Sequence, residues 1–247
     1  MDPNKALFET YKKYWPSLQI ALNQIASKRG IDIVQLKISY PLLIHVFPEY
    51  QKTKTKLMIV GQQTRGWGWK NIAKFWDTSK WDNSVEELIK ELIKVYKGFH
   101  LGEKYYPSPF WRSAHKLFGK LNPSGPEYGF LWSNLIKIDQ KGKDPKGFIK
   151  ETVCNSFPVL PLEIEVTRPD VAVFLTGPYY DKIIRQTFNG LSFDKIEGYK
   201  QRTLARIAHY RLPKDSFRTY HPNYFIRSGK SHELGKVFNK IADLVKN

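Results

Sequence analysis

Four short runs of apolar residues, set among longer segments with a helical pattern, constrain the fold more than any other feature of the sequence. The runs cover residues 56–60, 130–138, 171–175 and 217–220. Each has the length of a strand, and the segments between the first three are long enough to hold crossover helices. Strands that alternate with helices in this way usually pair in parallel. We therefore expect an α/β fold with a central four-stranded parallel sheet and helices on both of its faces.

The N-terminal segment shows the clearest helical pattern. Its aromatic and apolar residues recur at steps of three and four, which places them on one face of a helix: Phe8, Tyr11, Trp15, Leu18, Leu22 and Ile25. We expect this helix to restart at Pro16 and to end at Gly30. Since the sequence shows no internal repeat and no long linker, we predict a single domain over residues 1–247, with residues 1–50 as a helical extension.

Two further helices have recognisable ends. Residues 84–87 read Ser-Val-Glu-Glu, the spacing of a capping box, and Gly98 is placed to end the helix that follows. One face of that helix is predicted to carry Leu88, Leu92 and Val95. A C-terminal helix is predicted behind a Ser231 cap, and its apolar face consists of Leu234, Val237, Phe238, Ile241 and Leu244.

The charge of the chain is strongly positive. Forty Lys and Arg residues face 23 Asp and Glu residues, a net charge of +17. Such an excess speeds the capture of polyanions, of which nucleic acid is the commonest. A membrane surface is the competing partner, but it usually needs a compact basic cluster, whereas the charges here are scattered from Lys12 to Lys246. A basic protein without a polyanionic partner is the remaining alternative.

Cysteine content and hydropathy bear on the location of the chain. Cys154 is the only cysteine, so neither an intrachain disulfide nor a cysteine-based zinc site can form. The N-terminal residues lack the apolar stretch of a secretory signal, and the longest apolar run, residues 171–175, is far too short to span a membrane. We expect a cytoplasmic, monomeric protein that has no membrane partner.

Polar or glycine-containing segments follow three of the predicted strands. They are Gly61-Gln62-Gln63-Thr64, Thr176-Gly177-Pro178 and His221-Pro222-Asn223, while the strand over residues 130–138 carries Ser133 and Asn134 within it. Open parallel sheets bind ligands at the carboxyl ends of their strands. We therefore expect these groups to meet at one edge of the sheet and to form a site.

The side chains at this edge suit the recognition of a small polar ligand. Gly61 lets the backbone approach a ligand closely, and the amides after it can orient a water or bind the edge of a base. Asn134 either reads a ligand or ties down a neighbouring loop, since a buried amide without partners is costly. His221 can donate a hydrogen bond to charge that develops on a leaving group. Phe110, taken alone, is a core residue.

Together and in this order, the segments resemble the uracil-DNA glycosylase superfamily. The similarity runs from about Lys56 to Phe225. Gly61-Gln62-Gln63 falls where the family has its first motif, Gly-Gln-Asp-Pro-Tyr in one branch, and Phe110-Trp111-Arg112 looks like the Phe-Trp-Lys/Arg opening of a helix in another branch. Residues 130–134 are similar to the strand that ends in a base-reading Asn, and residues 161–177 resemble the helix and strand that end in Leu-Gly. Residues 221–225 match the His-Pro-Ser motif and the wedge loop that follows it.

The resemblance implies base excision without a metal or an organic cofactor. A base in a duplex must be flipped into a pocket before its glycosidic bond can be hydrolysed. Phe110 is expected to stack on the flipped base, Asn134 to read its edge, and His221 to stabilise the anionic base as the bond opens. Gly61 and Gln62 are expected to line the same base-binding pocket.

The resemblance also implies contacts to DNA outside the pocket. Phe225, with Ile226, is expected to fill the gap that the flipped base leaves in the duplex. Phosphate contacts are expected from basic side chains at the mouth of the site. The residues assigned to DNA binding are Arg65, Asn223, Phe225, Ile226 and Arg227.

The first motif departs from the family at its catalytic position. Gln63 stands where the family has the Asp or Asn that positions the attacking water, and Thr64 replaces the following Pro. Gln63 is expected to hold that water, although an amide cannot act as a base. The nearest candidate carboxylate is Asp139, just past the second strand, and Asn223 replaces the Ser of the His-Pro-Ser motif.

Three functions follow from these observations. The first is a DNA glycosylase-like enzyme that hydrolyses the bond to a uracil-like or damaged base. The second is a catalytically inactive module that binds DNA or a nucleobase with the same fold. The third, a basic α/β protein acting on small phosphorylated substrates, is disfavoured because the turn at Gly61 lacks the lysine of a phosphate-binding loop and no Gly-x-Gly-x-x-Gly follows a strand.

Overall fold

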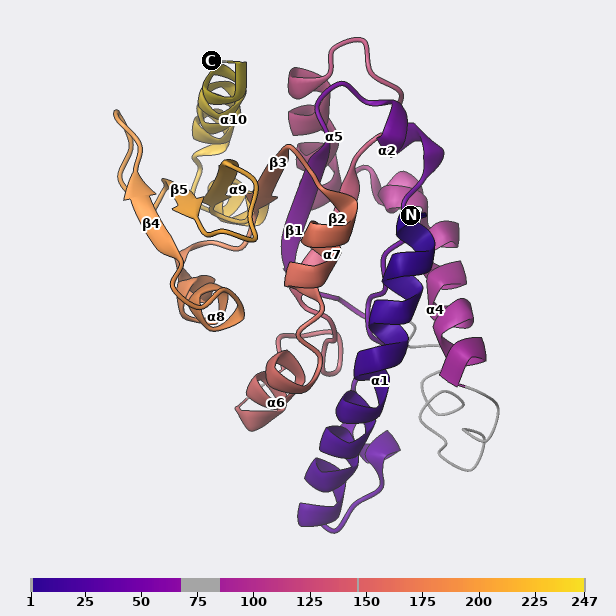
Figure 1. Ribbon diagram of the computed structural model, residues 1–247. Coiled ribbons are helices and arrows are strands. Elements are labelled where there is room, and N and C mark those ends of the chain that lie inside the picture. The colour runs from indigo at the N-terminus through magenta and orange to yellow at the C-terminus, as the bar shows by residue number, and fades with distance from the viewer. Residues whose placement is uncertain (1, 68–84, 146, 247) are drawn as a thin grey trace. The chain divides into compact units, whose positions relative to one another are not determined.

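The computed structural model describes residues 2–67, 85–145 and 147–246, and within them a six-stranded sheet is the central feature (Figure 1). The strands lie in the order β2-β1-β3-β6-β5-β4. Their bounds are β1 (Leu57–Gln63), β2 (Leu131–Ile136), β3 (Val171–Phe174), β4 (Ser192–Lys195), β5 (Leu204–Ala208) and β6 (Asp215–Thr219). The chain therefore has the mixed α/β architecture expected from its sequence.

Three of the strands predicted from apolar runs, β1, β3 and β6, pair in parallel. β3 pairs in parallel with β1, with Leu57 opposite Val171, and in parallel with β6, with Val171 opposite Asp215. All residues of β3 and residues 57–60 of β1 are buried. Strands covered on both faces need continuous apolar sequence, which is why the pattern revealed them.

The prediction of four strands is wrong, because β4 and β5 add an antiparallel pair. Ser192 lies opposite Ala208 in this pair, and β5 also runs antiparallel to β6. β4 contains one apolar residue, Phe193, and is mostly exposed at the edge of the sheet. A short polar edge strand has no apolar run by which it could be recognised.

The described residues also form α-helices and short 3-10 turns, most of which lie between the strands. The α-helices are α1 (Pro3–Lys28), α2 (Pro48–Lys52), α4 (Val85–Phe99), α5 (Pro109–Leu121), α6 (Phe148–Ser156), α7 (Leu160–Thr167), α8 (Asp181–Thr187), α9 (Pro222–Arg227) and α10 (Ser231–Lys246). Short 3-10 turns lie at η1 (Ile33–Leu36), η4 (His100–Tyr105) and η5 (Pro178–Tyr180). None of the helices in the described residues has both the length and the apolar character that a membrane crossing requires.

The N-terminal helix differs from its prediction in one respect. α1 is continuous through Pro16, where a restart was expected. Asp2 caps it by accepting a hydrogen bond from the Asn4 backbone N–H at 2.9 Å, and the chain leaves it through Gly30 at φ +62°. Burial on both sides of Pro16 accompanies this continuity: Tyr11 and Trp15 pack against Phe157 before it, and Leu18 and Leu22 are buried after it.

The two other predicted helices are present, with a corrected face for α4. Leu92 is buried as predicted, but the other buried residues are Ile89 and Tyr96, each one position after the predicted Leu88 and Val95, and Val95 is 36% exposed. The Ser84 end of the expected capping box lies outside the described residues. α10 begins at Ser231 as expected, and Val237, Phe238 and Ile241 are buried on it.

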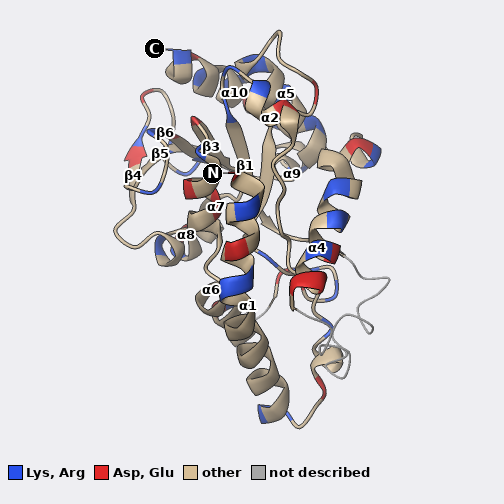
Figure 2. Cartoon of the chain, turned by 45° about the vertical axis from the view of Figure 1, so that its right-hand side comes forward, with Lys and Arg blue, Asp and Glu red and all other residues tan. Residues whose placement is uncertain are grey.

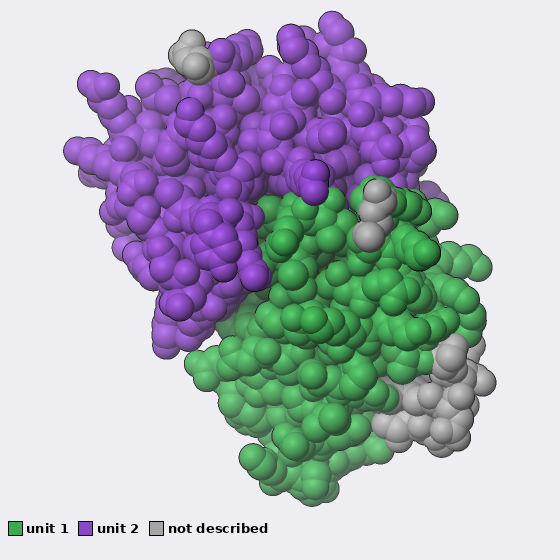
Figure 3. Space-filling model, viewed as in Figure 1, with its two compact units in different colours: residues 1–45, 62–98, 133–166 green, residues 46–61, 99–132, 167–247 purple. Residues whose placement is uncertain are grey.

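The contacts within the chain divide it into two compact units (Figure 3). Unit 1 consists of residues 1–45, 62–98 and 133–166, and unit 2 of residues 46–61, 99–132 and 167–247. The paired residues of β1, β3, β6, β5 and β4 belong to unit 2. Because α1 carries seven buried residues and packs against α6, residues 1–45 form part of the core of unit 1.

Candidate functional site

Phe110 and His221 lie together in unit 2. Ser108 caps α5 by accepting a hydrogen bond from the Trp111 N–H at 3.3 Å, and Pro109 begins the helix, so Phe110 lies in its first turn. His221 follows β6 and caps α9. The two rings are stacked, with centroids 5.6 Å apart and planes inclined by 22°. Two residues that are 111 positions apart are thus brought together as the motifs predicted.

The cap on α9 decides which nitrogen of His221 carries a proton. Nδ1 accepts a hydrogen bond from the Asn223 backbone N–H at 3.2 Å. A nitrogen that accepts cannot be protonated, so the proton of the neutral ring resides on Nε2. The backbone therefore presents His221 as a hydrogen-bond donor through Nε2–H.

The stack also limits how a base can reach Phe110. A flat ligand between two rings needs a centroid separation of about 7 Å, twice the contact distance of carbon atoms. The observed 5.6 Å leaves no such gap. A base that stacks on this face of Phe110 must displace His221, and otherwise it must use the opposite face.

Phe225 does not have the position expected of a residue that enters DNA. Its side chain is fully buried and makes edge contacts with the rings of Tyr220 and Tyr224, at centroid distances of 6.0 and 5.8 Å. Ile226, the next residue on α9, is 39% exposed. In a helix, adjacent residues point in directions about 100° apart, so only one of the two can face the core. Of the two residues expected to fill the gap in the duplex, Phe225 is therefore not placed to do so, and the role of Ile226 stays a prediction.

An aromatic and basic cluster in unit 2 escaped the sequence analysis. Tyr179 follows β3 and is 78% exposed, and the guanidinium of Arg202 lies 5.8 Å from its ring centroid. The rings of Tyr220 and Tyr224 stack at 3.9 Å, and a hydrogen bond to Tyr220 raises the pKa of Arg202. The Gly177-Pro178 turn before Tyr179 was the available signal, but the contact to Arg202 depends on a hairpin that the sequence did not reveal.

A buried ion pair holds this cluster in place. Arg218, on β6 and 1% exposed, binds Asp181 through Nε at 2.9 Å and through a terminal nitrogen at 3.0 Å. Its other terminal nitrogen donates to the carbonyl of Arg202 at 2.8 Å. Burial raises the pKa of Asp181 and lowers that of Arg218, while each partner opposes the shift in the other. Arg218 therefore has a positioning role for the Arg202 segment.

In unit 1, the segment after β1 is anchored by Asp139. Its carboxylate accepts hydrogen bonds from the Thr64 hydroxyl at 2.9 Å, the Gly66 N–H at 2.8 Å and the Gly142 N–H at 2.7 Å. Ser39 adds to this network by bonding the Thr64 hydroxyl at 3.0 Å. A fully buried carboxylate engaged by this many donors stabilises a loop, so Asp139 is not placed to act as a general base.

The polar residues of β2 also belong to unit 1. Asn134 is 1% exposed, and its neighbour Ser133 donates to the Glu163 carboxylate at 2.7 Å. The ammonium of Lys137 bonds both Ser133 and Glu163 at 2.5 Å, and the Tyr11 hydroxyl donates to Glu163 at 2.9 Å. Burial lowers the pKa of Lys137. This closed network explains why a strand of apolar residues contains Ser133.

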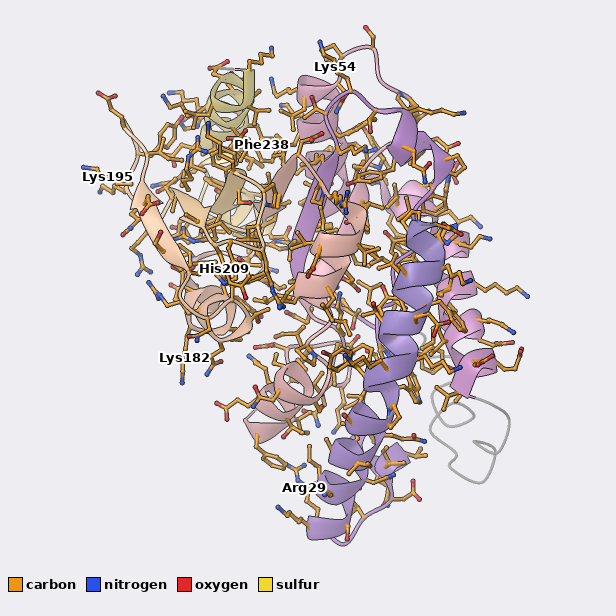
Figure 4. All side chains as sticks on the ribbon, viewed as in Figure 1. Arg29, Lys54, Lys182, Lys195, His209 and Phe238 are labelled. Atoms are coloured by element: carbon orange, nitrogen blue, oxygen red, sulfur yellow. The ribbon has the colours of Figure 1, made fainter. Side chains whose placement is uncertain are left out.

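The remaining predicted residues differ in how far they are exposed. Gly61 is buried, whereas Gln62 and Gln63 are half-buried at the end of β1 and Arg65 is exposed. Asn223 is half-buried and Arg227 exposed on α9. Basic residues are spread over most elements (Figure 2), and the side chains of Lys182 and Lys195 extend outward from α8 and β4 (Figure 4).

The structure thus brings together one part of the predicted site. Phe110, His221, Asn223, Ile226 and Arg227 belong to unit 2. Residues of unit 1 make up the other part: Gln62, Gln63, Arg65 and Asn134. That both parts serve one ligand stays a prediction.

Comparison with known proteins adds no relative. No protein-family model matches the sequence, and no curated protein matches it.

Proposed function

We propose that the chain binds DNA and hydrolyses the N-glycosidic bond of a flipped, uracil-like or damaged base, with a fold of the uracil-DNA glycosylase superfamily. The observation that carries this proposal is the pairing of Phe110 with His221, whose proton is held on Nε2 by the α9 cap. A flipped base needs an aromatic ring to stack on and a donor for its polar edge. Phe110 supplies the ring, and His221 supplies the donor once it has moved off the face of Phe110 on which the base stacks.

The chemistry assigned to these residues is a hydrolysis. A water attacks the anomeric carbon of the sugar, and the electron pair of the broken carbon–nitrogen bond stays on the base, which leaves as an anion. The proton that the water loses passes to solvent or to the departed base anion. The Nε2–H of His221 stabilises that anion, and a donor aimed at developing charge acts mainly in the transition state. Gln63 orients the water, Asn134 reads the base, and Gly61 and Gln62 complete the pocket.

DNA contacts outside the pocket are assigned to α9 and to the aromatic and basic cluster. Ile226 fills the place of the flipped base, and Asn223 and Arg227 bind phosphates. Tyr179 and Arg202 offer an exposed ring with a cation above it, a pairing that suits stacking against an unpaired base. The net charge of +17 supports a polyanionic partner.

A second function, binding of DNA or a nucleobase without catalysis, is favoured by one observation. The carboxylate nearest to the first motif in the sequence, Asp139, is engaged by the hydroxyl of Thr64 and by backbone N–H groups. Gln63 has an amide and cannot accept a proton from the attacking water. Hydrolysis would then rest on positioning and on His221 alone.

Excision and binding measured on the same oligonucleotides separate the two functions. The substrates carry uracil, hypoxanthine, xanthine or an oxidised pyrimidine, and alkaline strand scission reports release of the base. We expect the wild type to release at least one of these bases. Gln63→Ala should lower the excision rate strongly and leave DNA affinity nearly unchanged, because only the chemical step uses the positioned water. A wild type that binds DNA and releases none of the bases would establish the non-catalytic module.

A further inference from the structure

The described residues that line one pocket in unit 1 all have left-handed backbone. It has a volume of about 370 Å³, and its lining residues are Lys37, Gly66, Lys141 and Gly142. Their φ angles lie between +53° and +73°. The left-handed region suits glycine but is unfavourable for lysine, which has a Cβ atom. Two lysines in this conformation at one pocket point to a local constraint of the kind that accumulates at binding sites.

The two lysines are held next to each other by backbone hydrogen bonds. The Lys141 N–H donates to the carbonyl of Lys37 at 2.9 Å, and Ile38 forms a bridge with Gln140. The Gln140 side chain donates in addition to the carbonyl of Leu36 at 3.0 Å. Both lysine side chains are exposed. The backbone therefore keeps the two lysines next to each other at one pocket, where an anion between their ammonium groups would offset the repulsion of like charges.

The glycines form a rigid and open wall. The backbone N–H groups of Gly66 and Gly142 bind the Asp139 carboxylate, which is buried beneath them. A Cβ atom on Gly142 would lie 3.9 Å from the Gly66 nitrogen, so the two glycine backbones are side by side with no side chain between them. Arg65, just before Gly66, adds a third exposed positive charge to this segment.

We propose that this pocket binds a phosphate group between the ammonium groups of Lys37 and Lys141. Phosphate suits the site because it is a compact anion with several acceptor oxygens, and the glycine wall allows it to approach the backbone. The volume falls in the range of small-ligand sites. The phosphate comes from the backbone of a DNA strand or from a free oligophosphate. The proposal does not depend on base excision, because Phe110 and His221 take no part in it.

The test uses two double variants of the full chain. Lys37→Asn/Lys141→Asn removes both charges, and asparagine tolerates the left-handed backbone, so folding is retained. Lys94→Gln/Lys97→Gln is the matched control, since it removes two exposed charges from α4 in the same unit. Binding of a labelled single-stranded oligonucleotide is measured across a salt series. The Tm of each protein is measured with and without tripolyphosphate.

The two sources of phosphate give different results. If DNA is the source, the slope of log K against log salt becomes shallower by about 1.4 in the pocket variant, roughly 0.7 for each lost contact, and stays unchanged in the control. If a free oligophosphate is the source, tripolyphosphate raises the Tm of the wild type and the control, and leaves the Tm of the pocket variant unchanged. The proposal is overturned if the pocket variant matches the wild type in both measurements, or if both double variants weaken DNA binding equally.

The same measurements on His221→Ala separate this site from the proposed function. Loss of excision with an unchanged response to tripolyphosphate and an unchanged salt slope confines the failure to the base site. An altered response of His221→Ala in both measurements would show that the two lysines do not form an independent site, and would overturn the proposal.

Discussion

Replacement of Asp139 should reveal how much of the stability of unit 1 depends on one buried carboxylate. Asp139→Ala removes the acceptor of three short hydrogen bonds, which come from the buried Thr64 hydroxyl and from the part-buried N–H groups of Gly66 and Gly142. Hydrogen bonds to a charged group contribute about 1.5–3 kcal/mol each. The expected loss in the free energy of unfolding is therefore roughly 5 kcal/mol, comparable with the whole stability of many domains.

Urea unfolding followed by circular dichroism measures this loss. Asp139→Asn is the milder variant, because it keeps one oxygen acceptor but turns an amide N–H toward other donors; we expect a loss of about 2–3 kcal/mol. Asp144→Ala is the control in the same segment, where a partly exposed pair with Lys150 should contribute at most about 1 kcal/mol. Hydrogen exchange should accelerate at Gly66 and Gly142 in the Asp139 variants.

Two results would contradict the anchoring role of Asp139. If the free energies of unfolding of Asp139→Ala and of the Asp144→Ala control differ by less than about 1 kcal/mol, the Asp139 carboxylate does not anchor the segment after β1. If instead Asp139→Ala fails to fold, Asp139→Asn still supplies the comparison, and an unchanged stability of that variant would contradict the assignment equally well.

Three further expectations concern buried and titratable groups. Lys137→Met should lower the unfolding free energy by about 3–5 kcal/mol, because Glu163 then stays buried without a counter-charge, and adding Glu163→Gln should recover most of the loss in the same urea titration. His221→Ser keeps an oxygen that can cap α9, whereas His221→Ala does not, so only the alanine variant should lose about 1 kcal/mol of stability. Both variants should slow excision by about 10²–10³-fold, because both lack the Nε2–H donor. Normal excision by the serine variant would exclude the proposed donor. Burial lowers the pKa of His115, so the stability that depends on it is complete above about pH 6.5 and declines as the pH falls through the folded-state pKa. His115→Gln should flatten that decline in a pH series of unfolding midpoints, and an unaltered pH dependence would assign the decline to other groups.

The fold was predictable wherever burial imposed a pattern on the sequence. Residues 171–175 are apolar without interruption because β3 is buried between β1 and β6. β4 has one apolar residue in four and a neighbour on one side only, so nothing in its sequence distinguishes it from a loop. For α4 the sequence offered two overlapping apolar faces, and the packing of Ile89 and Tyr96 decided between them.

The candidate site was predictable to the extent that its residues lie at the ends of regular elements. Phe110 follows a Ser-Pro helix start and His221 follows a strand, so both positions could be derived from local signals. The choice between Phe225 and Ile226 could not, because α9 is too short to show a period. The pairing of Tyr179 with Arg202 depends on long-range packing through Arg218, which no local pattern encodes.

The interleaved make-up of the two units has a consequence for how the chain folds as it is synthesised. Unit 1 takes its last segment from residues 133–166, and unit 2 begins at residue 46 but needs residues 167–247. Neither unit can complete its core from the N-terminal part of the chain alone, because each contains a segment that is synthesised much later, residues 133–166 in unit 1 and residues 167–247 in unit 2. Contacts of this sequence separation slow folding and prolong the exposure of apolar strands such as β1 and β3. Shortened chains that end before β6 are therefore expected to aggregate rather than to yield one intact unit.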